Sequence, residues 1–140
     1  MKKLRFYTVG LLIIICCTVN GQANKGPKFC AGDLLGKAFI SDGQDHSGLV
    51  RKNKSTKFNI VFYPQFRYKL IVCSNNLKEP LEITLKDSNG KIFFTNANKD
   101  YIREWEFQYS SLMNATIEIK LVKKETTEDN IRLILGYKPI

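Results

Sequence analysis

Two glutamates separated by one residue, Glu104 and Glu106, are the first candidates for chemistry, because paired carboxylic groups can act as acid and base on a glycosidic bond. On a strand such residues share one face at a separation of about 7 Å, which an inverting hydrolase can use. Trp105 and Phe107 alternate with them, however, and this alternation is typical of a half-buried strand. We therefore interpret both glutamates as solvent-facing, and we predict no catalytic residue and no enzymatic activity.

A second group of polar side chains surrounds the only histidine, His46. Asp33, Asp42 and Asp45 near its loop could offer oxygen ligands to calcium, and Asp87 with Asn89 could do the same in a separate turn. Their spacing lacks the alternating oxygens and the closing glutamate of an EF-hand loop. Asp and Asn side chains often bond to their own backbone in turns. We therefore predict polar turns and an exposed histidine, and we expect no metal or other cofactor.

The N-terminal segment follows the pattern of a secretory signal peptide. Basic residues precede an apolar run over residues 6–19, which is shorter than the about 20 residues that a membrane-spanning helix needs. Small or modest side chains before Gln22 permit cleavage after Gly21. A lipid-modified cysteine is disfavoured, because an isoleucine precedes the first cysteine. The prediction is a signal peptide over residues 1–21 and export to the periplasm, cell surface or medium of a bacterium, without a stable transmembrane anchor.

Cleavage would remove Lys2, Lys3 and Arg5 and no acid, so the net charge would fall from +9 to +6. The remaining residues 22–140 have the length of one domain, and no linker or repeat divides them. A chain of this length can bury a core without a structural metal. A single domain over residues 22–140 is predicted.

Two cysteines, Cys30 and Cys73, would remain after cleavage, since Cys16 and Cys17 leave with the signal peptide. An even number of cysteines in an oxidising compartment favours a disulfide, and we predict one between Cys30 and Cys73. The alternative is a catalytic thiol with His46 as its base, which no nucleophile signature supports. The disulfide would tie the N-terminal segment to the end of a later strand.

Four basic residues fall within seven positions: Arg51, Lys52, Lys54 and Lys57. Such a cluster is usually a solvated loop, but it can also meet phosphate, anionic lipid or an acidic polysaccharide. Aromatic residues are interleaved with basic ones shortly afterwards, which strand alternation explains better than nucleic-acid binding. We predict a projecting loop that is the most favourable place for an acidic partner, and no nucleic-acid partner.

Apolar residues recur with a period of two after residue 56, which is the pattern of half-buried strands. The side chains predicted to face the core are Leu81, Ile83, Leu85, Trp105, Phe107, Tyr109, Ile117, Ile119, Leu121, Ile131, Leu133, Leu135 and Tyr137. Residues 81–95 predict a hairpin with a turn at residues 87–90. The runs KFNIVFY and FRYKLIVC, separated by Pro64 and Gln65, predict another strand pair. About seven to eight short strands without a long amphipathic helix indicate an all-β fold, an antiparallel, jelly-roll-like β-sandwich.

One segment, YKLIVCSNNLKEPLEITLKDSNGKIFFTN, resembles the middle of bacterial pre-peptidase C-terminal domains, with an alternating strand, an Asp-x-x-Gly turn and another strand. The segments GKAFISDGQDHSGLV, KFNIVFYPQFRYKLIVC and LILGYKP are similar to small secreted β-sandwich proteins of the Bacteroidetes that have no assigned activity. The resemblance covers most of residues 30–138 and implies an accessory module of exported proteins. It would place Asp87, Asn89 and Gly90 in a strand turn, and it carries over no catalytic residue.

The expected function is that of an exported, non-catalytic binding or accessory module of the cell envelope, with an envelope protein or an acidic glycan as its partner. A β-sandwich presents binding loops readily, and residue types suited to catalysis are sparse. The alternative is a small secreted hydrolase whose site is assembled from scattered residues.

Overall fold

The structure, a computed structural model, describes residues 30–140 except residue 124. The signal peptide predicted over residues 1–21 lies outside this range. The described elements are the 3-10 helix η1 (Gly32–Leu35) and the strands β1 (Ile40–Ser41), β2 (His46–Arg51), β3 (Thr56–Phe62), β4 (Phe66–Ser74), β5 (Leu81–Asp87), β6 (Ile92–Thr95), β7 (Glu104–Gln108), β8 (Met113–Leu121) and β9 (Glu128–Pro139). No helix in the described part of the chain is long and apolar enough to cross a membrane.

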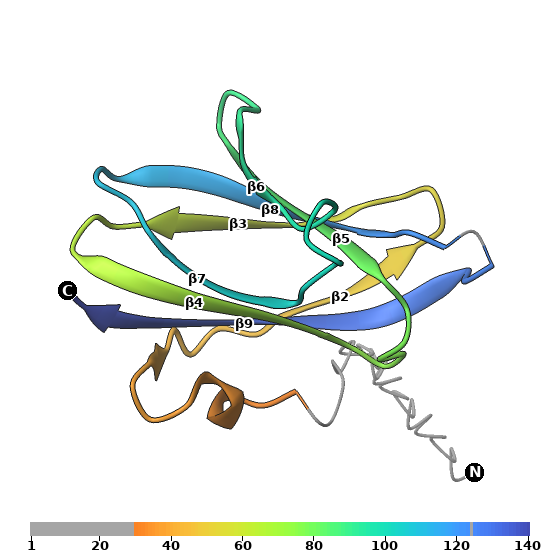
Figure 1. Cartoon of the computed structure of the whole chain (residues 1–140), viewed down its shortest axis with the longest axis horizontal. Coiled ribbons are helices and arrows are strands. Elements are labelled where there is room, and N and C mark those ends of the chain that lie inside the picture. Colours follow the sequence, from red (N-terminus) through yellow and green to blue (C-terminus); the bar gives the residue numbers. More distant parts are fainter. Residues whose placement is uncertain (1–29, 124) are drawn as a thin grey trace, which may run out of the picture.

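The strands form two antiparallel sheets that pack face to face (Figure 1). One sheet has the order β2-β9-β4-β7, and β1 continues its edge beside β9. The other has the order β3-β8-β5-β6. From β2 to β9 only β5 and β6 are consecutive strands of one sheet, and every other connection crosses between the sheets, which is the strand order of a jelly roll. The predicted all-β, jelly-roll-like sandwich is confirmed, and the short β1 adds one strand to those expected.

One predicted strand pair is wrong. β3 and β4 are joined by a tight turn, in which the Phe66 amide donates to the Tyr63 carbonyl at 3.4 Å, but they do not pair. β3 pairs with β8, whereas β4 pairs with β7 and β9. A short turn between two apolar runs usually joins hairpin partners, whereas here it carries the chain from one sheet to the other. The predicted hairpin of β5 and β6 does form, and Gly90 adopts a φ of 83° in its turn.

The core lies between the sheets and consists of side chains that point inward from both. The predicted core residues that are buried are Leu81, Ile83, Leu85, Ile117, Ile119, Ile131, Leu133 and Leu135, and those partly buried against them are Trp105, Phe107, Tyr109, Leu121 and Tyr137. Burial raises the pKa of the Tyr109 hydroxyl to about 12. Each fully buried aliphatic side chain stabilises the fold by about 1.5–3 kcal/mol, so the period-two pattern marks the residues that hold the sandwich together.

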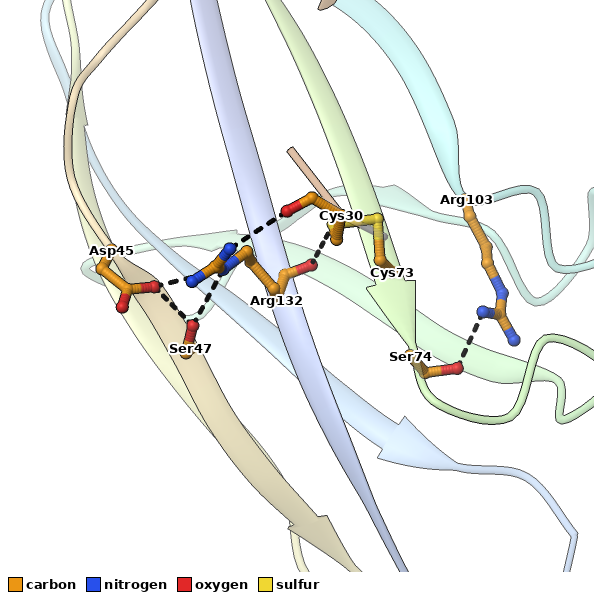
Figure 2. The surroundings of a disulfide bond; sticks show 7 residues. All are labelled: Cys30, Asp45, Ser47, Cys73, Ser74, Arg103 and Arg132. Atoms are coloured by element: carbon orange, nitrogen blue, oxygen red, sulfur yellow. Dashed lines mark hydrogen bonds and ion pairs between the residues drawn. A yellow bond between two sulfur atoms is a disulfide. The ribbon is translucent and has the colours of Figure 1, made fainter. Parts of the chain in front are cut away.

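A second, smaller hydrophobic cluster covers the outer face of the sheet that contains β9. Its members, which we call the outer cluster, are Cys30, Leu35, Phe39, Ile71, Cys73 and Ile134. Cys30 and Cys73 are joined by a disulfide with an S–S distance of 2.05 Å (Figure 2), in agreement with the prediction. Gly136 permits close packing here, because a Cβ at that position would lie 2.7 Å from Cδ2 of Leu35. The segment before β1 is therefore held on the sheet both covalently and by burial.

Candidate functional site

A cavity opens between the two sheets, at the end of the sandwich where β3 turns into β4. Its volume is about 500 Å³, within the range of small-molecule sites. Its lining comes from β2, β3, β4, β9 and the segment between β1 and β2: Asp42, Gln44, His46, Asn59, Ile60, Val61, Tyr63, Phe66, Tyr68, Leu135 and Tyr137. We call this space the intersheet cavity.

The intersheet cavity forms where the edge strand beside β9 is interrupted. Ser41 of β1 pairs with Gly136, and His46 of β2 pairs with Leu133. Four residues, 42–45, therefore stand opposite only two residues of β9, and the chain bulges from the sheet. No residue of β1 or β2 is paired with Leu135, which lines the cavity at this gap. We call residues 42–45 the bulge loop.

His46 and Asp42 form a polar pair in the cavity lining. His46 Nε2 lies 2.7 Å from Asp42 Oδ2, and the two side chains are 11% and 14% exposed. Asp42 Oδ1 also accepts a hydrogen bond from the Gln44 amide at 3.1 Å. The prediction of an exposed histidine is wrong, because β2 begins at His46 and directs the ring inward, where it meets the Phe58 ring edge to face at 6.0 Å. A polar ring in this half-buried position needs a hydrogen-bond partner, and Asp42 supplies it.

Aromatic rings form another part of the lining. The Phe66 ring meets the Tyr137 ring at 5.2 Å and the Tyr68 ring at 6.3 Å between centroids. The Tyr68 hydroxyl accepts a hydrogen bond from the Tyr63 amide at 2.8 Å, which fixes the β3–β4 turn, and burial raises the pKa of Tyr68. The Tyr63 side chain is 45% exposed at the rim. Ring faces and a few fixed polar groups thus meet in one cavity, which is the usual composition of a ligand site.

The bulge loop is supported from the outer face of the sheet by Arg132 (Figure 2). Arg132 Nε donates to Ser47 Oγ at 3.2 Å and lies 3.3 Å from Asp45 Oδ1. Its Nη1 donates to the Cys30 carbonyl at 3.1 Å, and the Ser47 hydroxyl donates to the Asp45 carboxylate. One guanidinium group therefore links the disulfide-bonded segment to the loop that carries Asp42.

The predicted basic segment lies at the opposite end of the sandwich, at the right of Figure 1, whereas the β3–β4 turn lies at the left. The prediction of a projecting loop over all four basic residues is wrong: Arg51 ends β2 and Lys57 lies in β3, so only residues 52–55 form the turn. Arg51 Nε lies 3.5 Å from Glu128 Oε2, and both side chains are more than half exposed. The two lysines of the turn have no acidic partner within 4 Å among the described residues. We call the exposed residues Arg51, Lys52, Lys54 and Lys57 the basic patch.

Glu118 neutralises part of the positive charge beside the basic patch. It faces outward on β8 opposite Lys57, yet it is only 8% exposed. Its carboxylate lies 2.5 Å from Lys86 Nζ and 3.7 Å from Lys120 Nζ. The hydrogen bond from Lys86, together with one from Ser55, lowers the pKa of Glu118 to about 2. An anion is thus built into the sheet beneath this basic surface.

The remaining polar candidates make local structural contacts. Glu104 and Glu106 lie on the outward side of β7, and Glu104 pairs with Lys69 at 2.6 Å. Asp87 Oδ1 accepts two amide hydrogen bonds at 2.9 Å in the β5–β6 turn, as the turn interpretation predicts. Asp33 lies exposed in η1. Within the described residues, no group of three or more His, Cys, Asp or Glu side chains is arranged to hold a metal ion.

No family model and no curated protein matches this chain. The resemblance to pre-peptidase C-terminal domains stays a prediction, and the functional conclusion rests on the geometry of the intersheet cavity and on the surface charge.

Proposed function

We propose that this protein is an exported, non-catalytic binding or accessory module of the bacterial cell envelope and that the intersheet cavity is its ligand site. The observation that carries the proposal is the combination of aromatic ring faces with the Asp42–His46 pair in one cavity of about 500 Å³. The surroundings support a preformed site, because Arg132 holds the bulge loop and Tyr68 holds the β3–β4 turn. A site that is already ordered loses less conformational entropy when a ligand binds.

The basic patch has a separate role in this proposal. Exposed lysines that lack acidic partners increase the rate of encounter with an anionic surface, and this effect weakens as salt rises. The β2–β3 turn and the β3–β4 turn lie at opposite ends of the sandwich (Figure 1). The patch lies at the first turn and the intersheet cavity beside the second, so we assign attraction to the envelope to the patch and recognition of the ligand to the cavity.

Retention on isolated envelopes of the producing bacterium tests this assignment. The exported protein should sediment with the envelopes, and a soluble envelope extract should compete for it. His46→Gln should lower retention at every salt concentration, whereas serine at the four basic positions should lower it only at low salt. Phe93→Ala is a matched control, because Phe93 is 44% exposed and lies outside the cavity lining. A wild-type protein that stays in the supernatant at low salt would contradict the proposal.

The Asp42–His46 pair also supports a second candidate function, a small secreted hydrolase. A carboxylate can orient an imidazole that then takes a proton from an attacking group. Among the described residues, no hydroxyl is hydrogen-bonded to His46, and the Cys30 and Cys73 sulfurs are bonded to each other. Water would therefore have to be the nucleophile. Turnover of chromogenic glycosides or esters by the wild type, lost in His46→Gln, would favour the hydrolase over the binding module.

A further inference from the structure

We infer that the intersheet cavity binds a neutral sugar ring of a glycan. This inference rests on the proposed binding function and specifies the ligand of the same site. Three properties of the lining carry it: the aromatic faces, the mixture of hydrogen-bond donors and acceptors, and the absence of lysine and arginine from the described lining.

The aromatic faces suit the apolar side of a pyranose ring. The C–H groups on one side of such a ring form a flat apolar surface, which packs on an aromatic face as other flat ligands do. Tyr63 is half-exposed at the rim, and Phe66 and Tyr137 are partly buried behind it. A ring that enters between the sheets would therefore contact aromatic carbon along its path.

The polar groups suit the hydroxyl edge of the same ring. A sugar hydroxyl both donates and accepts, so its site needs both kinds of partner. The Asp42 carboxylate lines the cavity and is an acceptor, as its hydrogen bond from the Gln44 amide at 3.1 Å shows. The Gln44 side chain, which makes no hydrogen bond to another described residue, offers one donor and one acceptor group.

The charge of the lining favours a neutral ligand. No lysine or arginine occurs among the described lining residues, so a phosphate, sulfate or uronate would meet Asp42 without a basic partner other than His46. A cationic ligand would have to compete for Asp42, whose Oδ2 contacts His46 and whose Oδ1 accepts the Gln44 amide. A neutral ring avoids both costs, because it can share these groups without bringing an uncompensated charge.

The affinity for one sugar should be weak. A monosaccharide has few non-hydrogen atoms, and at ordinary ligand efficiency this gives a Kd on the order of 1 mM. Longer glycans that repeat the same unit would bind more tightly through additional contacts or multivalency.

The inference can be tested by titrating the exported protein with sugars and following the NMR chemical shifts of its backbone amides. The probes are glucose, galactose, mannose, N-acetylglucosamine, xylose and fucose, with glucuronate, inorganic phosphate and choline as charged alternatives, each up to about 20 mM to exceed the expected Kd. We expect at least one neutral sugar to give saturable shifts at the amides of residues 42–46 and 63–68. Asp42→Asn and Tyr63→Ala should each weaken binding by about tenfold. Asp33→Asn and Phe93→Ala are the matched controls and should bind as the parent does.

The outcomes separate this inference from the function on which it rests. If no neutral sugar gives saturable shifts while the protein is retained on envelopes, the sugar inference is wrong and the binding function stands. Shifts at these amides with choline, phosphate or glucuronate alone would also overturn it. If the wild-type protein is not retained on envelopes, the binding function itself is contradicted. Neutral-sugar shifts confined to other residues would show that the cavity is not the site.

Discussion

The two ends of the sandwich differ in how their candidate sites are built. The basic patch comes from residues 51–57, a single stretch of chain that carries its charge wherever it folds. The intersheet cavity is lined by residues between Asp42 and Tyr137, and it exists only when β3, β4 and β9 have assembled around the bulge loop. The patch is therefore a local property of the chain, whereas the cavity is a property of the fold.

This difference determines which substitutions should alter the structure of each site. The cavity depends on the outer cluster, because Arg132 joins the Cys30 carbonyl to the bulge loop. The basic patch depends on exposed charges and on Glu118, and no residue of the outer cluster belongs to β2 or β3, the strands that carry the patch. Changes in packing should therefore damage the cavity end first, and changes in charge should alter the patch alone.

The largest effect should follow from loss of the disulfide. The bond closes a loop between positions separated by 43 residues, and replacing Cys30 and Cys73 by alanine should lower the free energy of unfolding by about 3–4 kcal/mol. Urea unfolding of the oxidised parent and the double variant measures the loss. Amide hydrogen exchange should rise more at residues 41–47 than at residues 51–57. Equal acceleration at both segments would break the proposed link between the outer cluster and the cavity.

Gly136→Ala should have the next largest effect, because it overfills the outer cluster without removing a covalent bond. The added Cβ would lie 2.7 Å from Leu35 Cδ2 and 3.1 Å from the Phe39 Cβ, so the buried Leu35 side chain must move and its neighbours in the outer cluster must adjust. Overpacking of this kind costs about 1–3 kcal/mol. Gly32→Ala is the matched control, since the nearest atom to its added Cβ would be 3.8 Å away. An unchanged urea midpoint for Gly136→Ala would show that the outer cluster is looser than its contacts indicate.

The sequence was sufficient for the features that depend on local pattern. Alternation of apolar residues identified the inward faces of β5, β7, β8 and β9, and the two cysteines left after the predicted cleavage identified the disulfide. The pairing of β3 was not predictable in the same way, because a strand has two edges and its own residues do not say which neighbour each edge meets. A tight turn after Phe62 indicated a hairpin that the jelly roll replaces with a crossing.

The cavity could not be predicted either, because it too depends on strand pairing. His46 ends the segment SDGQDH, whose composition is that of an exposed turn. Only the register with Leu133 shows that His46 begins a strand and points inward. Strand alternation accounts for the burial of the aromatic residues near Pro64, but it does not predict the space beside them.

Acidification should weaken the sheet beside the basic patch, because it protonates Glu118. The pKa of Glu118 is lowered to about 2 from 4.5, so its stabilising contribution is complete above pH 4.5 and is lost as the pH falls toward 2. Because its lysine partners are partly exposed, the loss should be only about 1–2 kcal/mol. Glu118→Gln should be less stable than the parent at neutral pH by this amount, and the two urea midpoints should converge near pH 2. Parallel midpoints throughout this range would show that Glu118 contributes no net stability.

The smallest effect on stability should come from replacing the basic patch with serine. The ion pair between Arg51 and Glu128 is exposed, and such pairs contribute about 0–1 kcal/mol. The turn lysines have no acidic partner within 4 Å among the described residues, and their removal relieves mutual repulsion. The free energy of unfolding should therefore change by no more than about 0.5 kcal/mol.

The same quadruple variant should nevertheless alter binding in one specific way. Retention on envelopes should lose most of its dependence on salt, because the exposed cations that the salt screens are gone. Binding of a neutral sugar in the intersheet cavity should be unchanged, because none of the four replaced side chains lines it. If the variant instead loses sugar binding while its urea midpoint stays within the expected limit, the two ends are coupled along β2 and β3, and the cavity depends on a charge that the structure places at the far end of both strands.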